Sequence, residues 1–422
     1  MEAKRTYFPG LNSLRFFAAM AVVLTHIELT KKLLFHKCHL WLKTDDWFIG
    51  NAWQSIWRQG PPQPIPWQSP FVTFGGYFGV IFFFVLSGFL ITYLLLREKE
   101  EHQSIDVRKF YVRRILRIWP LYFLLIILGF FVLPHLSWFV IPSQQRLLNE
   151  HFWFNLITYS LMVPNFGFAY LMESVPNLGQ LWSIGVEEQF YLFWPLFILF
   201  SKKHLRNIVI FLVVLTAIKA GAFIYFHFLS PAIKGDADLL QFSTADIFKR
   251  LLSTLKFESM ALGGIGACIV YYQKSRALKL IYHPFTQVAS LLALPAIILF
   301  TPTSLYNALY LLLSVPCLII IMNVGCNENC LYRLRHAWFN YLGKISYGIY
   351  MYHLICITFT FQMMDACFDM PYEITWVQNL AIYCISIALT LLTSALSYQY
   401  IEKPFIQRKA NYAIVQSGEK ES

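Results

Sequence analysis

Apolar runs of about 20 residues, separated by short polar stretches, recur along the whole chain. An α-helix needs roughly that many residues to cross about 30 Å of hydrocarbon. Apolar residues make up 57% of the chain and charged residues 14%, and the mean hydropathy is +0.51. Soluble domains are more polar than this, and membrane β-strands would alternate over segments of about ten residues. The sequence therefore predicts an all-α integral membrane protein.

The runs predict about ten transmembrane helices in one bundle. We expect them at residues 11–29, 77–96, 118–140, 181–200, 207–229, 255–272, 280–300, 305–323, 337–362 and 376–400. Residues 151–172 are also apolar, but a crossing there would reverse every later helix, so we expect a re-entrant or interfacial segment on the outer side. A single membrane domain over 1–405 then includes a long outer loop at 30–76, and 406–422 form a short cytoplasmic tail.

The net charge of +11 could indicate a nucleic-acid partner. Basic residues of a multipass protein, however, collect in cytoplasmic loops and set its orientation. With the amino terminus inside, the predicted cytoplasmic segments hold more Lys and Arg than the outer ones, so topology explains the charge. We therefore expect both termini in the cytoplasm and no nucleic-acid partner. We also expect no metal site, because the cysteines in 326–330 have no second pair of ligands nearby.

The stretch SLRFFAAMAVVLTHIE carries Arg15 and His26 inside the first predicted crossing. Eleven residues make three helical turns plus about 20°, so the two side chains share one face about 16 Å apart along the axis. Ionisable groups in a membrane normally face a protein interior or an aqueous cavity. Arg15 could instead snorkel to the headgroups and His26 could be interfacial, but their shared face favours a polar channel.

A basic cluster, RKFYVRRILRIWPLY, opens the third predicted crossing from the cytoplasmic side. Arg114 and Arg117 are three residues apart and so are neighbours on one helix face. Guanidinium groups suit phosphate oxygens, and a phosphate-bearing ligand entering from the cytoplasm would meet this pair first. The alternative is positive-inside anchoring, which the neighbouring basic residues serve in any case.

Two later crossings carry ionisable residues in the outer half of the membrane. Glu187 and Glu188 lie in the fourth, and because adjacent positions point about 100° apart, we expect only one to face the cavity. His353 lies in the ninth. With His26, a carboxylate and two imidazoles at similar depth could form a proton-handling group. The alternatives are wet glutamates beyond the helix end and a core histidine bonded to a tyrosine.

Ser87 and Gly88 lie in mid-helix within FFFVLSGFLITYLL. A serine beside a glycine in a membrane helix is most often a close-packing device. Ser87 could be a nucleophile only if a base reached it.

In order along nearly the whole chain, these motifs resemble the acyltransferase family 3 of multipass membrane O-acyltransferases. The resemblance rests on the arginine and histidine of the first helix, on FFFVLSGFLI, RRILRIWPLYF, LWSIGVEEQFYLFWP and ISYGIYMYH, and on the closing YIEKPF. It implies transfer of an acyl group, most often acetyl from cytoplasmic acetyl-CoA, to a hydroxyl of an extracytoplasmic polysaccharide or lipid-linked glycan. It also implies residence in a bacterial inner (plasma) membrane.

The resemblance assigns roles to several residues. The matching positions are the first-helix pair Arg15 and His26, the paired arginines Arg114 and Arg117, the acidic motif centred on Glu187, the late histidine His353, and Ser87 in the Ser-Gly element. We hypothesise that the three arginines hold the phosphates of coenzyme A while His26 does the acid-base chemistry. His26 either deprotonates the sugar hydroxyl or carries the acyl group transiently. Glu187 would orient or charge-balance His26.

The loop at 30–76 is long for this family and carries five tryptophans, Trp41, Trp47, Trp53, Trp57 and Trp67. Indole faces suit sugar rings, so the loop could guide the acceptor; the alternative is an interfacial aromatic belt. Many family members carry a soluble esterase-like domain that we do not see here, so a soluble acyl-accepting partner is a further possibility. A transporter of a sugar or lipid-linked sugar is the alternative function, although we find no internal repeat to favour it.

Overall fold

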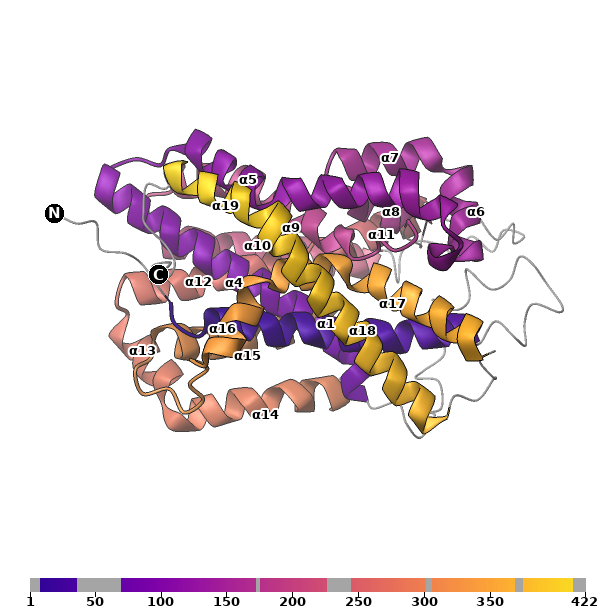
Figure 1. The fold of residues 1–422 in the computed structure, drawn as a ribbon. Helices are drawn as coiled ribbons and strands as arrows, with labels where there is room; N and C mark the ends of the chain where they lie inside the picture. The colour runs from indigo at the N-terminus through magenta and orange to yellow at the C-terminus, as the bar shows by residue number, and fades with distance from the viewer. Residues whose placement is uncertain are drawn as a thin grey trace.

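The computed structural model describes residues 8–35, 70–171, 175–225, 244–300, 306–368 and 375–412. Every regular element in these ranges is helical, and no strand occurs among them (Figure 1). The all-α prediction is therefore confirmed. The tryptophan-rich part of the 30–76 loop lies outside the described residues.

Long helices run along the bundle and shorter ones lie near its ends (Figure 1). The long helices are α1 Leu11–Phe35, α4 Pro70–His102, α5 Val107–Ile127, α9 Leu181–Phe200, α10 His204–Ile224, α12 Phe257–Tyr271, α14 Pro284–Phe300, α15 Tyr306–Cys326, α17 Ser346–Phe368 and α18 Trp376–Ser397. The shorter helices are α6 Pro142–Glu150, α7 Phe152–Ser160, α8 Pro164–Leu171, α11 Thr244–Thr254, α13 Ser275–Tyr282, α16 Ala337–Lys344 and α19 Lys403–Lys409.

The number of membrane crossings is not confirmed as about ten. Five described helices are long and apolar enough to span, namely Leu11–Lys31, Phe78–His102, Val107–His135, His204–Ile224 and Trp376–Lys409. A sixth span is possible if Ser275–Tyr282 and Pro284–Ile297, which meet at 62°, are counted together. Helix α9 falls short because Glu187 and Glu188 lower its hydropathy, and α12 has only 15 residues.

In the described part of the apolar segment 151–172, two short helices form rather than one long one. α7 and α8 have 9 and 8 residues, each too few to cross a bilayer. Met162, with φ of 59°, makes the turn between them. Figure 1 shows α6, α7 and α8 together at one end of the bundle. The re-entrant or interfacial placement stays a prediction.

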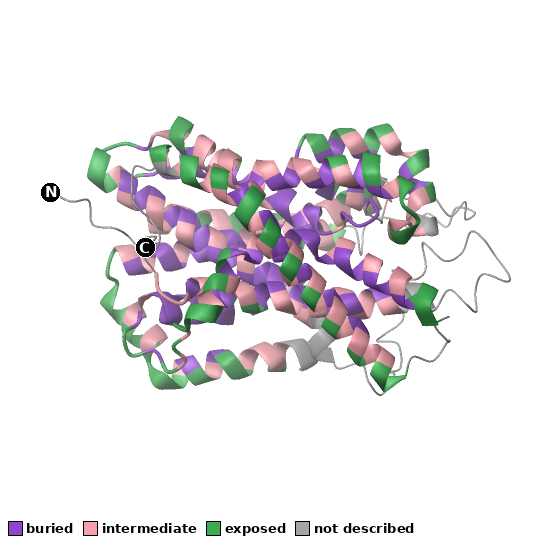
Figure 2. Ribbon diagram, in the orientation of Figure 1, coloured by how far each residue is buried: buried purple, intermediate pink, exposed green. Residues whose placement is uncertain are grey.

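Apolar side chains cover the surface of the bundle that faces away from its interior. On α10, Val213 is 60% exposed and Ile218 57% exposed, whereas buried residues gather between the helices (Figure 2). Exposed apolar surface of this extent marks a membrane-facing or partner-facing region. The pattern fits a multipass membrane protein.

Close approach of backbones holds α4 against α12. A Cβ atom on Gly88 would lie 1.9 Å from the carbonyl oxygen of Met260, and one on Gly263 would lie 2.1 Å from that of Val85. Only glycine fits at such contacts. The close-packing interpretation of the Ser-Gly element is therefore confirmed at Gly88.

Hydrogen bonds at both ends hold α9, the helix that carries Glu187. At the carboxyl-terminal end of α9, the Lys99 ammonium donates to the carbonyl oxygens of Ile198, Leu199 and Ser201 at 3.1, 2.8 and 3.0 Å. These carbonyl oxygens would otherwise lack partners. Just before its start, Gln180 Nε2 donates to the Met351 carbonyl on α17 at 2.6 Å. These contacts tie α9 to α4 at one end and to α17 at the other.

Candidate active site

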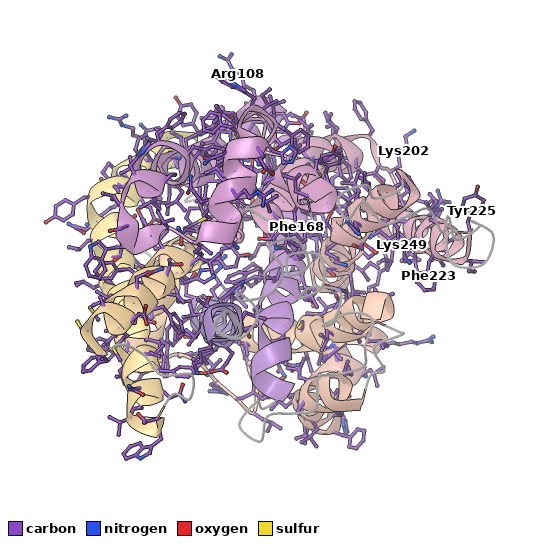
Figure 3. All side chains as sticks on the ribbon, turned by 90° about the vertical axis from the view of Figure 1, so that its right-hand side faces the viewer. Arg108, Phe168, Lys202, Phe223, Tyr225 and Lys249 are labelled. Atoms are coloured by element: carbon purple, nitrogen blue, oxygen red, sulfur yellow. The ribbon has the colours of Figure 1, made fainter. Side chains whose placement is uncertain are left out.

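Helix α1 lies inside the bundle, between α17 and α18 on one side and α4 on the other (Figure 3). Its His26 meets His353 of α17. The Nδ1 atom of His26 lies 3.3 Å from Nε2 of His353, and the ring centroids are 4.8 Å apart at 59°. The structure therefore brings together the two predicted imidazoles from helices far apart in sequence.

The backbone around the two rings defines their tautomers. His26 Nδ1 is 2.9 Å from the Val22 carbonyl oxygen, and His353 Nδ1 is 2.7 Å from the Tyr350 carbonyl oxygen. A carbonyl oxygen can only accept, so each Nδ1 carries the proton. When both rings are neutral, the Nδ1–H group of His26 is shared between two acceptors, the Val22 carbonyl oxygen and His353 Nε2. His26 Nε2 is left with a lone pair, as a base requires.

The two histidines differ in accessibility. His353 is 0% exposed, whereas His26 is only partly buried. A substrate could therefore reach His26 but not His353. The arrangement suits a reactive His26 held in place by His353.

Arg15, three turns before His26 on α1, lies among other cations. Its Nη1 donates to Asn12 Oδ1 at 2.8 Å, and Asn12 in turn donates to Asn340 Oδ1 of α16 at 2.7 Å. The charge of Arg15 interacts with those of Arg114 and Arg117 on α5. The three predicted arginines therefore form one cluster, which is defined by the interaction of their charges and not by direct contacts.

Aromatic rings hold the Arg114 guanidinium. Its central carbon lies 5.4 Å from the Phe110 ring centroid and 5.7 Å from that of Tyr191, within cation–π range. Its buried Nε has no hydrogen-bond partner. Arg108, by contrast, is exposed and points away from the bundle (Figure 3). Arg114 is therefore buried among aromatic rings, whereas Arg108 lies at the surface.

Glu187 bonds to Tyr191 rather than to His26. Tyr191 OH donates to Glu187 Oε2 at 3.1 Å, and the same hydroxyl is hydrogen-bonded to Ser87 of α4. Among the described contacts, no hydrogen bond joins Glu187 to His26. The charge of Glu187 instead interacts with those of Arg15 and Arg117. The described contacts of the predicted carboxylate are therefore to Tyr191 and to the charges of the arginines.

Glu188 faces a different helix from Glu187, as the 100° step between adjacent positions predicts. Its Oε2 accepts from Trp119 Nε1 of α5 at 3.3 Å. Its buried Oε1 has no partner.

Sequence reasoning missed Tyr191, although its position four residues after Glu187 places both on one helix face. It also missed a polar group at the far end of α1 from Arg15. There Glu28 accepts from Lys31 and from Tyr383 of α18, and Lys31 also donates to Asn379. Glu28 and Lys31 are neighbours on one face of α1, and the packing of α1 on α18 adds Tyr383 and Asn379 to them.

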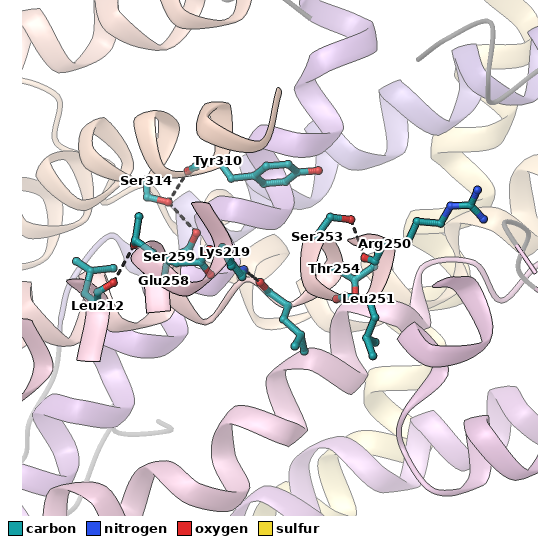
Figure 4. A network of polar contacts seen from close by, with 12 residues as sticks. Leu212, Lys219, Arg250, Leu251, Ser253, Thr254, Glu258, Ser259, Tyr310 and Ser314 are labelled. Atoms are coloured by element: carbon teal, nitrogen blue, oxygen red, sulfur yellow. Dashed lines mark hydrogen bonds and ion pairs between the residues drawn. The ribbon is translucent and has the colours of Figure 1, made fainter. Parts of the chain in front are cut away.

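A second polar network lies between α10, α12 and α15 (Figure 4). Lys219 forms an ion pair with Glu258 at 2.6 Å, and Ser314 donates to Ser259 at 2.8 Å. The network shares no residue with the candidate site, and its internal pairing indicates a structural role. Within the described ranges, no group of three or more His, Cys, Asp or Glu could hold a metal ion.

Comparison with known proteins adds a match over nearly the whole chain. A family profile described as an acyltransferase domain matches residues 8–399. A Staphylococcus aureus (strain COL) protein, named provisionally as an O-acetyltransferase, is 26% identical over 416 residues, 95% of this chain and 58% of that protein. The O-acetyltransferase OatA of S. aureus strain NCTC 8325 is 27% identical over 410 residues, 94% of this chain and 57% of its own length. The chain thus spans less than two thirds of these relatives, and no solved structure matches it significantly.

Proposed function

The chain belongs to the acyltransferase 3 family, and from that premise we propose that it is an O-acyltransferase of the plasma membrane. It transfers an acetyl group from cytoplasmic acetyl-CoA to a hydroxyl of a polysaccharide or lipid-linked glycan on the opposite side. Two relatives named as O-acetyltransferases support the acetyl group and the hydroxyl acceptor. In this proposal the amino-terminal end of α1 and the carboxyl-terminal end of α19 lie on the cytoplasmic side, together with the arginine cluster.

The observation that carries the proposal is that His26, on the same helix as Arg15, contacts the Val22 carbonyl and His353 through Nδ1. The helix rise separates the two residues by about 16 Å along the axis. Coenzyme A has phosphates at one end and a thioester at the end of a long thin arm. Arg15, Arg114 and Arg117 would hold the phosphates, and the arm would bring the thioester toward His26.

In the general-base route, His26 Nε2 takes the proton of the sugar hydroxyl as its oxygen attacks the thioester carbonyl. The C–S bond then breaks, and the departing thiolate takes the proton from His26. The Nδ1–H group of His26 points to His353 Nε2 and to Val22, so both acceptors stabilise the imidazolium. Positioned proton transfer of this kind contributes about 10²- to 10⁴-fold in rate.

In the covalent route, His26 Nε2 itself attacks the thioester and forms an acyl-imidazole while the thiolate leaves. The sugar hydroxyl then attacks that carbonyl, the C–N bond of the acyl-imidazole breaks to restore His26, and the hydroxyl proton ends on the coenzyme A thiolate. Both routes use the same atom. A protein mass increased by one acetyl group at His26, trapped with donor and no acceptor, would select the covalent route.

Glu187 and Tyr191 act on the arginine side in this proposal. The carboxylate offsets part of the charge of Arg15 and Arg117, and Tyr191 packs against Arg114. The pair therefore positions the phosphate-binding arginines. A soluble acyl-accepting partner, which would replace the glycan, would receive the group from the same histidine.

The test is to express wild type and His26→Ala in the native host and to measure O-acetyl esters on the surface glycan. We expect ester loss with the protein still inserted and the glycan still at the surface. His135→Ala is the matched control, because His135 is exposed and lies outside the site. Retained esters would overturn the proposal, and glycan missing from the surface would point to transport instead.

A further inference from the structure

Helix α19 packs along α5, the helix that carries Arg114 and Arg117 (Figure 1). The chain beyond it is tied to the same helix, because Arg113 Nη1 donates to the Tyr412 carbonyl oxygen at 2.9 Å. Arg113 also forms an ion pair with Glu98 at 2.9 Å. The carboxyl-terminal segment is therefore part of the wall around the cation cluster.

Lys409, the last residue of α19, adds a charge to this cluster. Its side chain is partly buried, and its charge interacts with those of four arginines, Arg117, Arg114, Arg113 and Arg15. Arg113 has Glu98 as its partner. The other four cations of the cluster are Lys409, Arg15, Arg114 and Arg117. Within the described ranges, none of them forms an ion pair with a carboxylate.

Like charges gathered in a low-dielectric interior repel one another strongly. The nearby carboxylates reduce the repulsion only in part: Glu187 and Glu402 interact with Arg117, and Glu188 with Arg114. Four unpaired cations supplied by α1, α5 and α19 therefore favour a ligand with several negative charges. Coenzyme A carries a diphosphate and a separate ribose phosphate.

We propose that Lys409 is a phosphate ligand of the acyl donor and that α19 completes the donor site. The proposal rests on the proposed function. Lysine suits this position because its ammonium acts as a compact point charge that can reach any phosphate oxygen. Lys409 lies beyond the residues 8–399 that match the family profile, so the family pattern does not single it out.

The first experiment measures the Kd of coenzyme A for purified wild type, Lys409→Gln and Arg408→Gln. Arg408 is the matched control, because it is the neighbouring cation on the same helix but is exposed and lies over Phe405. We expect Lys409→Gln to weaken binding about tenfold, the effect of one hydrogen bond to a charged group. Arg408→Gln should bind like wild type, and Lys409→Arg should recover most of the affinity.

The second experiment separates phosphate binding from a structural role. Acetyl-pantetheine has the thioester arm but no phosphate, so its kcat/KM should be the same for Lys409→Gln and wild type. A parallel loss with acetyl-pantetheine and acetyl-CoA would mean that Lys409 only supports the fold, and it would overturn the proposal.

The two proposals fail in different ways. Wild type that does not bind coenzyme A would overturn the donor assignment and the role of Lys409 with it. Wild type that binds coenzyme A, with Lys409→Gln binding equally well, would overturn the role of Lys409 alone.

Discussion

The Nε2 atom of His353 lies 3.3 Å from the Nδ1 atom of His26, so a buried imidazole on α17 orients a partly exposed imidazole on α1. The Tyr350 carbonyl holds the proton of His353 on the opposite nitrogen. The pair is thereby prepared to leave His26 Nε2 free for chemistry.

His353→Ala should lower kcat about 10- to 100-fold, less than the 10²- to 10⁴-fold expected for loss of His26. The reason is that His26 keeps its Val22 contact but loses the acceptor that stabilises its charged form. The KM for donor should not change, because His353 touches no substrate in the proposal. His353→Gln, whose amide oxygen can accept a hydrogen bond, should retain more activity than His353→Ala. A raised donor KM with normal kcat would contradict the positioning role.

Arg114→Lys should raise the KM for acetyl-CoA about tenfold, because the charge survives while the planar, stacked guanidinium is lost. Membrane insertion should not change. The measurement is steady-state kinetics on purified protein, with Arg108→Lys as the control at an exposed position of the same helix. Equal donor KM in Arg114→Lys and wild type would speak against the phosphate role.

Tyr191→Phe should lower the free energy of unfolding by about 1 to 3 kcal/mol, because Glu187 Oε2 and Ser87 both lose their bond to the hydroxyl. The ring stays beside Arg114, so the cation–π contact persists. A thermal melt in detergent measures the change. Tyr170→Phe is the control, since Tyr170 is 46% exposed, and equal melting temperatures of the two variants would refute the hydrogen-bonded chain.

Gly88→Ala should destabilise the protein by about 1 to 3 kcal/mol or more, because the new methyl group would overlap the Met260 backbone and push α4 from α12. Gly221→Ala is the matched control. Nothing lies within 4 Å of its Cβ position on α10, so alanine there should be neutral or stabilising by up to about 1 kcal/mol. Thermal unfolding of both variants tests the difference. A melting temperature of Gly88→Ala no lower than that of Gly221→Ala would contradict the close-packing role of Gly88.

Sequence alone predicted the helical membrane character and the approximate positions of most long helices, because the length of an apolar run and the rise of a helix are local properties. Two predicted crossings were wrong in their bounds: 118–140 begins at Val107 in α5, and 337–362 is divided into α16 and α17. It also predicted that Arg15 and His26 share one helix and that Glu187 and Glu188 face different directions. The predicted number of about ten spans is not confirmed, because helices such as α9 and α12, which the sequence analysis counts as crossings, are too polar or too short in the folded chain to meet the length and hydropathy of a span.

Contacts between helices were decided only by the tertiary structure. A hydrogen bond reaches about 3 Å, whereas the rotation and depth of one helix against another depend on packing such as the Gly88–Met260 approach. Sequence reasoning therefore could not distinguish His353 from Glu187 as the partner of His26. Nor could it place Lys409 beside Arg114 and Arg117, since nearly 300 residues separate α19 from α5 and only the folded bundle brings their charges together.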